Sequence, residues 1–147
     1  MADLRELYQE VVIDHSKRPR NFREMEGADR VAQGYNPLCG DRITLYLKLR
    51  NGGIEDISFQ GSGCAISTAS ASILTETLKG KTTEEAAILF DGFHDMVTGK
   101  EAPAAPLEKL AVFSKVSDYP VRVKCATLVW HTLRAALGAE KAVASTE

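Results

Sequence analysis

The apolar positions of the chain change their spacing along its length, and each spacing predicts a different kind of element. Residues 3–17 carry apolar side chains three and four positions apart, which indicates an amphipathic helix. Between residues 43 and 49 every second side chain is apolar, which predicts a strand with one buried face. The turn sequence Asn51-Gly52-Gly53 then reverses the chain, and the alternation continues to Gly61. Residues 30–61 are therefore expected to form an antiparallel meander.

Helical spacing returns after the meander. A helix of mostly small residues is predicted between Cys64 and Gly80, followed by a second helix from the capping box at residues 82–85 to Val97. Further helices are expected over residues 107–113 and from Pro120 to the stop signal at Gly138, after a proline-containing loop at 99–106. Strands followed by helices predict an α+β domain over residues 1–138, and residues 139–147 are expected to be a disordered tail.

Length and charge narrow the class of protein. The chain has 147 residues, which fits one domain, and 44 % of them are apolar. Its formal net charge of −2 argues against general binding to nucleic acid or to anionic membranes. No apolar run approaches the roughly 20 residues of a membrane span, and the charged first residues lack the core of a signal peptide. These features predict a cytoplasmic protein.

Three cysteines are the strongest chemical feature, and an odd number in a reducing compartment argues against a disulfide framework. Cys39 lies in a turn that enters a strand, and Asp41, two residues later, points to the same side of an extended segment. Cys64 lies where a helix begins, and free backbone N–H groups at that end favour a thiolate. Cys125 lies on the inward stripe of the last helix. These four residues are the predicted ligands of one metal ion.

The spacing of the cysteines leaves alternatives open. Three sulfurs and one oxygen suit tetrahedral zinc, while soft thiolates also suit iron–sulfur clusters. Three separate buried cysteines that pack as small hydrophobic residues are a third interpretation. Zinc with three thiolates and a carboxylate has a formal charge of −2, for which the basic neighbours Arg122 and Lys124 are the predicted compensation. Of the histidines, we expect His15 in the core, His94 at the surface and His131 too far from Cys125 to share its ion.

The segments around the cysteines resemble the three cysteine motifs of the SufU/IscU family, which includes NifU N-terminal-like domains. The matching segments are residues 36–41, 61–67 and 124–128, and the resemblance extends over nearly the whole chain. It implies an IscU/NifU-like fold, a three-stranded antiparallel sheet packed by helices, with the motifs converging at one end. It also implies a role in iron–sulfur cluster assembly.

Two features are similar to the SufU branch of that family. Lys124 stands where IscU scaffolds usually carry a histidine, and the region 82–97 adds about one helix before the third cysteine. The resemblance then implies a zinc-dependent sulfurtransferase with Zn²⁺ on Cys39, Asp41, Cys64 and Cys125, and with Cys39 as the sulfur acceptor. Sulfur would come from a SufS-like cysteine desulfurase and go towards a SufBCD-type assembly complex. The alternatives are a scaffold that assembles and transfers a [2Fe–2S] cluster, and a purely structural zinc domain.

Overall fold

The computed structural model describes residues 4–99, 108–138 and 141–145. Most predicted elements are confirmed within a few residues of their expected bounds, although part of the proline-containing loop, residues 100–107, lies outside the described residues. In chain order the elements are α1 (Leu4–Lys17), β1 (Arg30–Asn36), β2 (Asp41–Arg50), β3 (Gly53–Ser62), α2 (Ala65–Leu78), α3 (Thr83–Val97), the 3₁₀ helix η1 (Glu108–Asp118), α4 (Pro120–Gly138) and β4 (Lys141–Ser145).

The sheet has the strand order β3-β2-β1-β4, in which the first three strands form the predicted antiparallel meander. The α+β class is confirmed, but the expected three-stranded antiparallel sheet is wrong in detail, because β4 adds a fourth strand parallel to β1. The expectation of a disordered tail is also wrong for residues 141–145, which form β4. The physical reason is that β1 would otherwise present an unpaired edge, and a strand following α4 satisfies its backbone groups.

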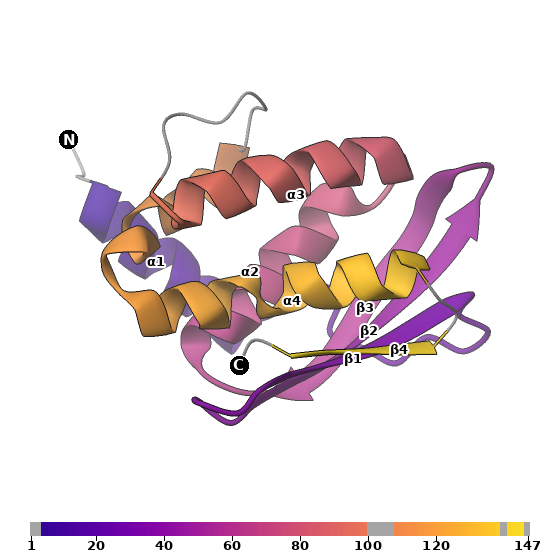
Figure 1. Cartoon of the computed structure of the whole chain (residues 1–147), viewed down its shortest axis with the longest axis horizontal. Helices are drawn as coiled ribbons and strands as arrows, with labels where there is room; N and C mark the ends of the chain where they lie inside the picture. Colours follow the sequence, from indigo (N-terminus) through magenta and orange to yellow (C-terminus); the bar gives the residue numbers. More distant parts are fainter. Residues whose placement is uncertain (1–3, 100–107, 139–140, 146–147) are drawn as a thin grey trace.

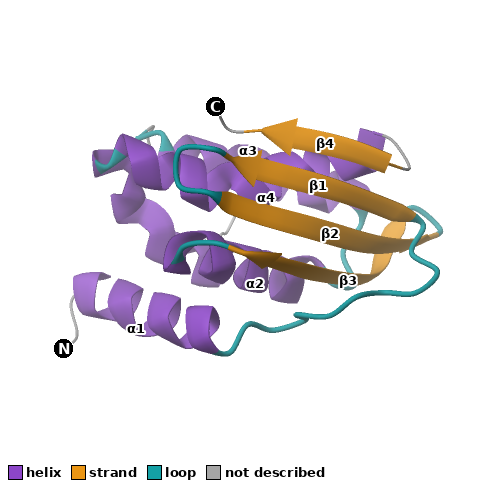
Figure 2. Ribbon diagram, turned by 90° about the horizontal axis from the view of Figure 1, so that it is seen from below, coloured by secondary structure: helices purple, strands orange, loops and turns teal. Residues whose placement is uncertain are grey.

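Helices cover one face of this sheet, as Figures 1 and 2 show from two directions. Buried and more exposed residues alternate along β2, with Ile43, Leu45 and Leu47 inward, so that the strand presents one apolar face to the helices. Helix α4 packs closely because β1 has Gly34 at the contact, where any Cβ would collide with the Thr132 hydroxyl. Among the described helices, none is long and apolar enough to cross a bilayer.

Helix α3 forms an outer layer against η1 and α4 (Figure 1). Its first turn has the predicted capping box, in which Thr82 and Glu85 exchange hydrogen bonds. Its inner face brings Phe93 into a stack with Trp130 at 4.9 Å between ring centroids and edge-on to Phe113 at 5.9 Å. Aromatic packing therefore holds α3, η1 and α4 together.

Helix α1 is joined to α2 by a fully buried hydrogen bond. The expectation of a core histidine is confirmed, because His15 is 0 % exposed and its Nδ1 lies 2.7 Å from the Ser72 hydroxyl. That hydroxyl also accepts a hydrogen bond from the backbone N–H of Arg20. The neutral imidazole thus fixes the end of α1 on the helix that begins at Cys64.

The burial of His15 predicts a loss of stability in mild acid. Burial lowers the pKa of His15 to about 4, with Lys109 and Arg20 acting in the same direction and Glu76 and Asp14 opposing it. Below about pH 6.5 the unfolded chain binds a proton that the folded chain does not bind until about pH 4. The free energy of unfolding should therefore fall by up to about 1.4 kcal/mol per pH unit across this window.

Urea unfolding of wild type and His15→Gln between pH 7.5 and pH 4 measures this effect. The variant should be less stable at pH 7.5 and should have a shallower pH dependence above pH 4. Equal pH slopes for the two proteins would contradict the assignment of a buried neutral imidazole.

Candidate metal centre

Three segments that are far apart in the sequence meet at one end of the sheet. The turn between β1 and β2 lies there because Asn36 pairs with Asp41, and the junction of β3 with α2 lies beside it because Arg42 pairs with Ser62. Helix α4 packs across β1 and β2, so that its first turns, which contain Cys125, lie at the same end of the sheet. The meander and its covering helix are therefore what positions the site.

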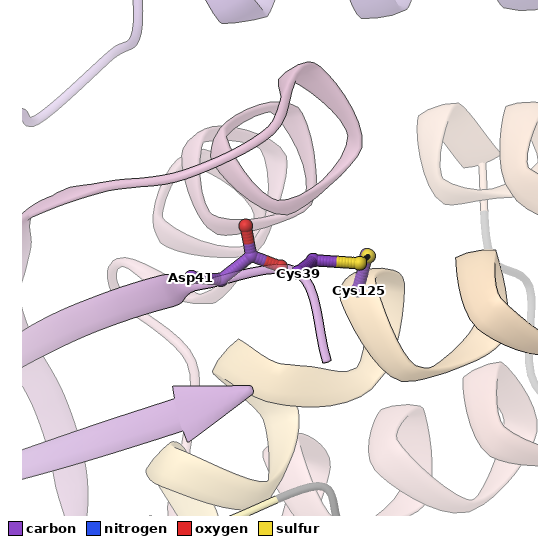
Figure 3. Close-up of side chains that lie close together, drawn as sticks. All are labelled: Cys39, Asp41 and Cys125. Atoms are coloured by element: carbon purple, nitrogen blue, oxygen red, sulfur yellow. Dashed lines mark hydrogen bonds between the residues drawn. The ribbon is translucent and has the colours of Figure 1, made fainter. Parts of the chain in front are cut away.

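Three of the four predicted ligands gather directly. Figure 3 shows the side chains of Cys39, Asp41 and Cys125 pointing toward one another. One ligand atom from each of them lies within 4.8 Å of the others, and the sulfurs of Cys39 and Cys125 are 3.3 Å apart. All three cysteines are free. Side chains from distant segments therefore come together here, and their binding of one metal ion stays a prediction.

The fourth predicted ligand, Cys64, lies at the side of this group. Its sulfur is 3.8 Å from Asp41 Oδ2, although it is not among the three atoms that lie mutually closest. It is the N-cap of α2, and its Sγ accepts a hydrogen bond of 3.4 Å from the backbone N–H of Ser67. The predicted position at a helix start is therefore confirmed, and the sulfur is held by the helix terminus.

Asp41 ties these segments together. Its carboxylate is 1 % exposed; Oδ1 accepts a 2.8 Å hydrogen bond from the Cys64 N–H, and Oδ2 accepts one of 3.2 Å from Asn36 Nδ2. Gly63 leaves the necessary room, since a Cβ there would lie 2.5 Å from Oδ1. Oδ2 also accepts a 3.8 Å hydrogen bond from the Cys64 thiol, so that both of its acceptor positions face groups of this site.

Exposure differs sharply between the sulfurs. Cys39 is exposed, Cys64 is half-buried, and Cys125 is 3 % exposed. Burial raises the pKa of the Cys64 thiol, and the Ser67 N–H only partly offsets this. Burial also raises the pKa of Cys125, and its contact with Cys39 acts in the same direction. The helix terminus alone therefore does not turn Cys64 into a thiolate, whereas a bound metal cation would lower the pKa of this thiol.

The donor set fits zinc. A tetrahedral ion with Zn–S bonds of about 2.3 Å separates its sulfurs by about 3.8 Å, and the 3.3 Å between Cys39 and Cys125 is near that value. Cys39, Asp41, Cys64 and Cys125 would supply three sulfurs and one oxygen. The same soft sulfurs suit iron, so that the donor set does not by itself choose the metal.

The predicted charge compensation by Arg122 and Lys124 stays a prediction. The Arg122 guanidinium lies over the ring of Tyr119, 4.4 Å from its centroid, and both residues are exposed at the start of α4. Lys124 is half-buried directly before Cys125. Sequence analysis missed Asn36, whose amide contacts two of the predicted ligands. The sequence Asn36-Pro37 did not reveal this role, because asparagine is common at turns, where its side chain can bond to nearby backbone groups.

The histidines gather elsewhere. His94, His131 and Phe90 form a cluster of three rings where α3 meets α4, with 6.3 Å between the two histidine ring centroids. Both are half-buried, so that His94 is less exposed than expected. His15 belongs to α1 and is buried against α2. The cage of Cys39, Asp41 and Cys125 therefore includes no histidine in the part of the chain that the structure describes.

Comparison with known proteins places the chain in a family. The family model described as the NifU-like N terminal domain matches residues 7–126. A protein from Streptococcus pyogenes named iron–sulfur cluster assembly scaffold protein IscU is 45 % identical over 93 % of this chain and 86 % of its own length. A protein from Bacillus subtilis named zinc-dependent sulfurtransferase SufU is 43 % identical over 99 % of this chain and 95 % of its own length.

A solved structure supports the same placement. A crystal structure from Fervidobacterium islandicum, described as a putative iron–sulfur cluster assembly scaffold protein for the SUF system, superimposes with a TM-score of 0.85 at 39 % identity. It covers 90 % of this chain and 97 % of its own. The IscU/NifU-like fold is therefore confirmed over nearly the whole chain.

Proposed function

The chain belongs to the family of NifU-like N-terminal domains, and from this premise we propose that it serves iron–sulfur cluster assembly as a zinc-dependent sulfurtransferase. The near full-length match to a SufU protein supports this proposal, as do the matches to IscU proteins at the level of cluster assembly. The names of the relatives divide between sulfur transfer and scaffolding, so the proposal rests on the chemistry of the site itself.

The observation that carries the proposal is the exposure of Cys39. It is the one exposed member of a group whose other members, Asp41 and Cys125, are buried. A protein that receives sulfur from an enzyme needs one sulfur that a partner can reach and a fixed frame around it. Because Cys39 lies in a turn before β2, it also moves at less cost than a cysteine within a helix.

The transfer itself is an exchange between sulfurs. The Cys39 thiolate attacks the outer sulfur of a persulfide on a cysteine desulfurase, the sulfur–sulfur bond of that persulfide breaks, and the enzyme's cysteine leaves as a thiolate. Cys39 then carries the persulfide, with no net oxidation or reduction. Zinc, when bound, would hold the thiols deprotonated at neutral pH. The remaining predicted ligands, Asp41, Cys64 and Cys125, would hold the zinc ion beside Cys39.

The partners follow from this exchange. The donor is a SufS-like cysteine desulfurase, because the sulfur must arrive as a persulfide on a protein cysteine. The recipient is an assembly complex of the SufBCD type that consumes persulfide sulfur. The protein acts catalytically in the sense that Cys39 is regenerated when the sulfur is passed on.

A cluster scaffold is the second candidate function, and the three gathered thiols are the observation that favours it, since thiolates are the usual ligands of iron–sulfur clusters. Metal content separates the two functions. Under the main proposal, aerobically purified protein is colourless and holds about one zinc per chain. Under the alternative, it is brown and passes its cluster to an apo-acceptor.

A paired experiment tests the proposal. Elemental analysis of the purified protein is followed by an assay of a SufS-like desulfurase with and without the zinc form. Zinc near one per chain together with faster alanine release supports a sulfurtransferase. Zinc without faster turnover would leave only a structural zinc domain and would refute the proposal.

A further inference from the structure

We propose that Asn36 is a positioning residue of the metal centre, whose side-chain amide holds the carboxylate of Asp41 and the sulfur of Cys125 in place as ligands. This inference rests on the proposed binding of zinc at the site and concerns a residue that supplies no ligand itself. The amide stabilises the charged ligands through hydrogen bonds, in addition to the basic side chains of Arg122 and Lys124 that the sequence predicts for this role.

The contacts of Asn36 carry the inference. Its Nδ2 donates to Asp41 Oδ2 at 3.2 Å and to Cys125 Sγ at 3.5 Å, so that one amide group bridges ligands from β2 and α4. The orientation of the amide is fixed by chemistry, because a carboxylate can only accept and Nδ2 is the only donor of the side chain. These are two predicted ligands from segments 84 positions apart in the sequence, 125 − 41.

The burial of Asn36 supports a role beyond packing. The residue is 0 % exposed, and its Oδ1 has no hydrogen-bond partner in the described part of the chain. A buried amide with an unpaired oxygen is unfavourable for stability, and an apolar side chain of similar volume would avoid that penalty. The bonded group of the amide, Nδ2, faces the predicted metal site, so the favourable contacts of this buried side chain are those with Asp41 and Cys125.

The electrostatics point the same way. Three thiolates and a carboxylate around Zn²⁺ have a net charge of −2, and two of these groups, Asp41 and Cys125, are buried. Hydrogen bonds to ionised sulfur and oxygen are about twice as strong as neutral ones, and they work where water is excluded. Asn36 serves both buried ligands, whereas the Cys64 N–H serves Asp41 and the Ser67 N–H serves Cys64. The Asn36 amide and the two backbone N–H groups therefore stabilise the negative charge of the predicted ligands.

Two substitutions separate positioning from packing. Asn36→Leu keeps about the same volume and removes the donor, while Asn36→Ala removes the donor and leaves a space. Ser58→Ala is the matched control, because Ser58 is equally buried in the sheet, its hydroxyl also lacks a partner in the described residues, and it is not among the gathered ligands. Zn²⁺ affinity is measured by competition with a chelator, and the Co²⁺ form is measured by its absorption spectrum.

Both Asn36 variants should bind Zn²⁺ about 10–100-fold more weakly than wild type, the usual effect of losing a hydrogen bond to a metal ligand. In the Co²⁺ form their sulfur-to-cobalt charge-transfer band should shift to lower energy, since a thiolate without its donor is more electron-rich. A mere loss of stability lowers the melting temperature of the metal-free protein but does not move this band. If Asn36→Leu is insoluble, Asn36→Ala is judged by the same two measurements.

Zn²⁺ affinity of the soluble variants within about threefold of wild type, with an unshifted band, would overturn the role of Asn36 while leaving the zinc site intact. If instead wild type itself binds no Zn²⁺ in the competition assay, the proposed function fails, and the role of Asn36 fails with it. Tight wild-type binding with weak binding by Asn36→Leu and tight binding by Ser58→Ala supports the inference.

Discussion

Replacing Cys39 with alanine is expected to abolish the acceleration of a cysteine desulfurase while leaving the fold intact. Cys39 is exposed in a turn, so its loss removes little packing and should change the free energy of unfolding of the metal-free protein by no more than about 0.5 kcal/mol. It removes the one exposed sulfur among the three cysteines, since Cys64 is half-buried with its sulfur bonded to the Ser67 N–H, and Cys125 is buried. The stimulated rate should therefore fall to that of the desulfurase alone.

The measurement is the release of alanine from cysteine by a SufS-like desulfurase, with wild type, Cys39→Ala and a matched control, Leu38→Ala. Leu38 is the preceding residue of the same turn and is 61 % exposed, so its substitution perturbs the turn to a similar degree and keeps the sulfur. The zinc content and melting temperature of each variant are recorded with the rates. Wild-type stimulation by a folded, zinc-loaded Cys39→Ala protein would show that another group accepts the sulfur.

Replacing Cys125 with alanine is expected to remove the metal. Its buried sulfur lies 3.3 Å from Cys39 Sγ and 3.5 Å from Asn36 Nδ2. Zinc bound by four protein ligands is held by roughly 10–16 kcal/mol, so that the loss of one of four ligands costs on the order of 100-fold in affinity or more. Zn²⁺ should then be lost during purification in the presence of a chelator.

Thr127→Ala is the control for Cys125→Ala. Thr127 lies two residues along the same helix and is also buried. Among the described residues, its hydroxyl bonds to the backbone carbonyls of Val123 and Lys124 in that helix. This variant should retain about one zinc per chain. If Cys125→Ala retained the metal at wild-type affinity, Cys125 would be a packed thiol and the site would have different ligands.

Much of the fold follows from local patterns. The alternation from Ile43 to Leu49 predicts β2, and the capping box at Thr82 predicts the start of α3, because period and caps are properties of short segments. The position of Cys64 at a helix start is of the same kind. The strand β4 could not be predicted this way. Its five residues form a strand only because β1 offers an edge to pair with, which is a property of the assembled sheet.

The site was predictable as a set of residue types but not as a network. Cysteines beside glycines and an aspartate two residues from Cys39 predict a metal site by their chemistry. The role of Asn36 depends on the pairing of β1 with β2 and on the packing of α4 against them, so that no local sequence pattern predicts it. The compensating charge that the sequence predicts on Arg122 and Lys124 stays a prediction, and the Arg122 guanidinium lies over Tyr119.

X-ray absorption at the zinc edge of the fully loaded protein tests the central claim most directly, that ligands from three distant segments surround one ion. A coordination shell of three sulfurs at about 2.3 Å and one oxygen at about 2.0–2.2 Å is the predicted result. A shell without sulfur, or with fewer than three sulfurs at one zinc per chain, would contradict it.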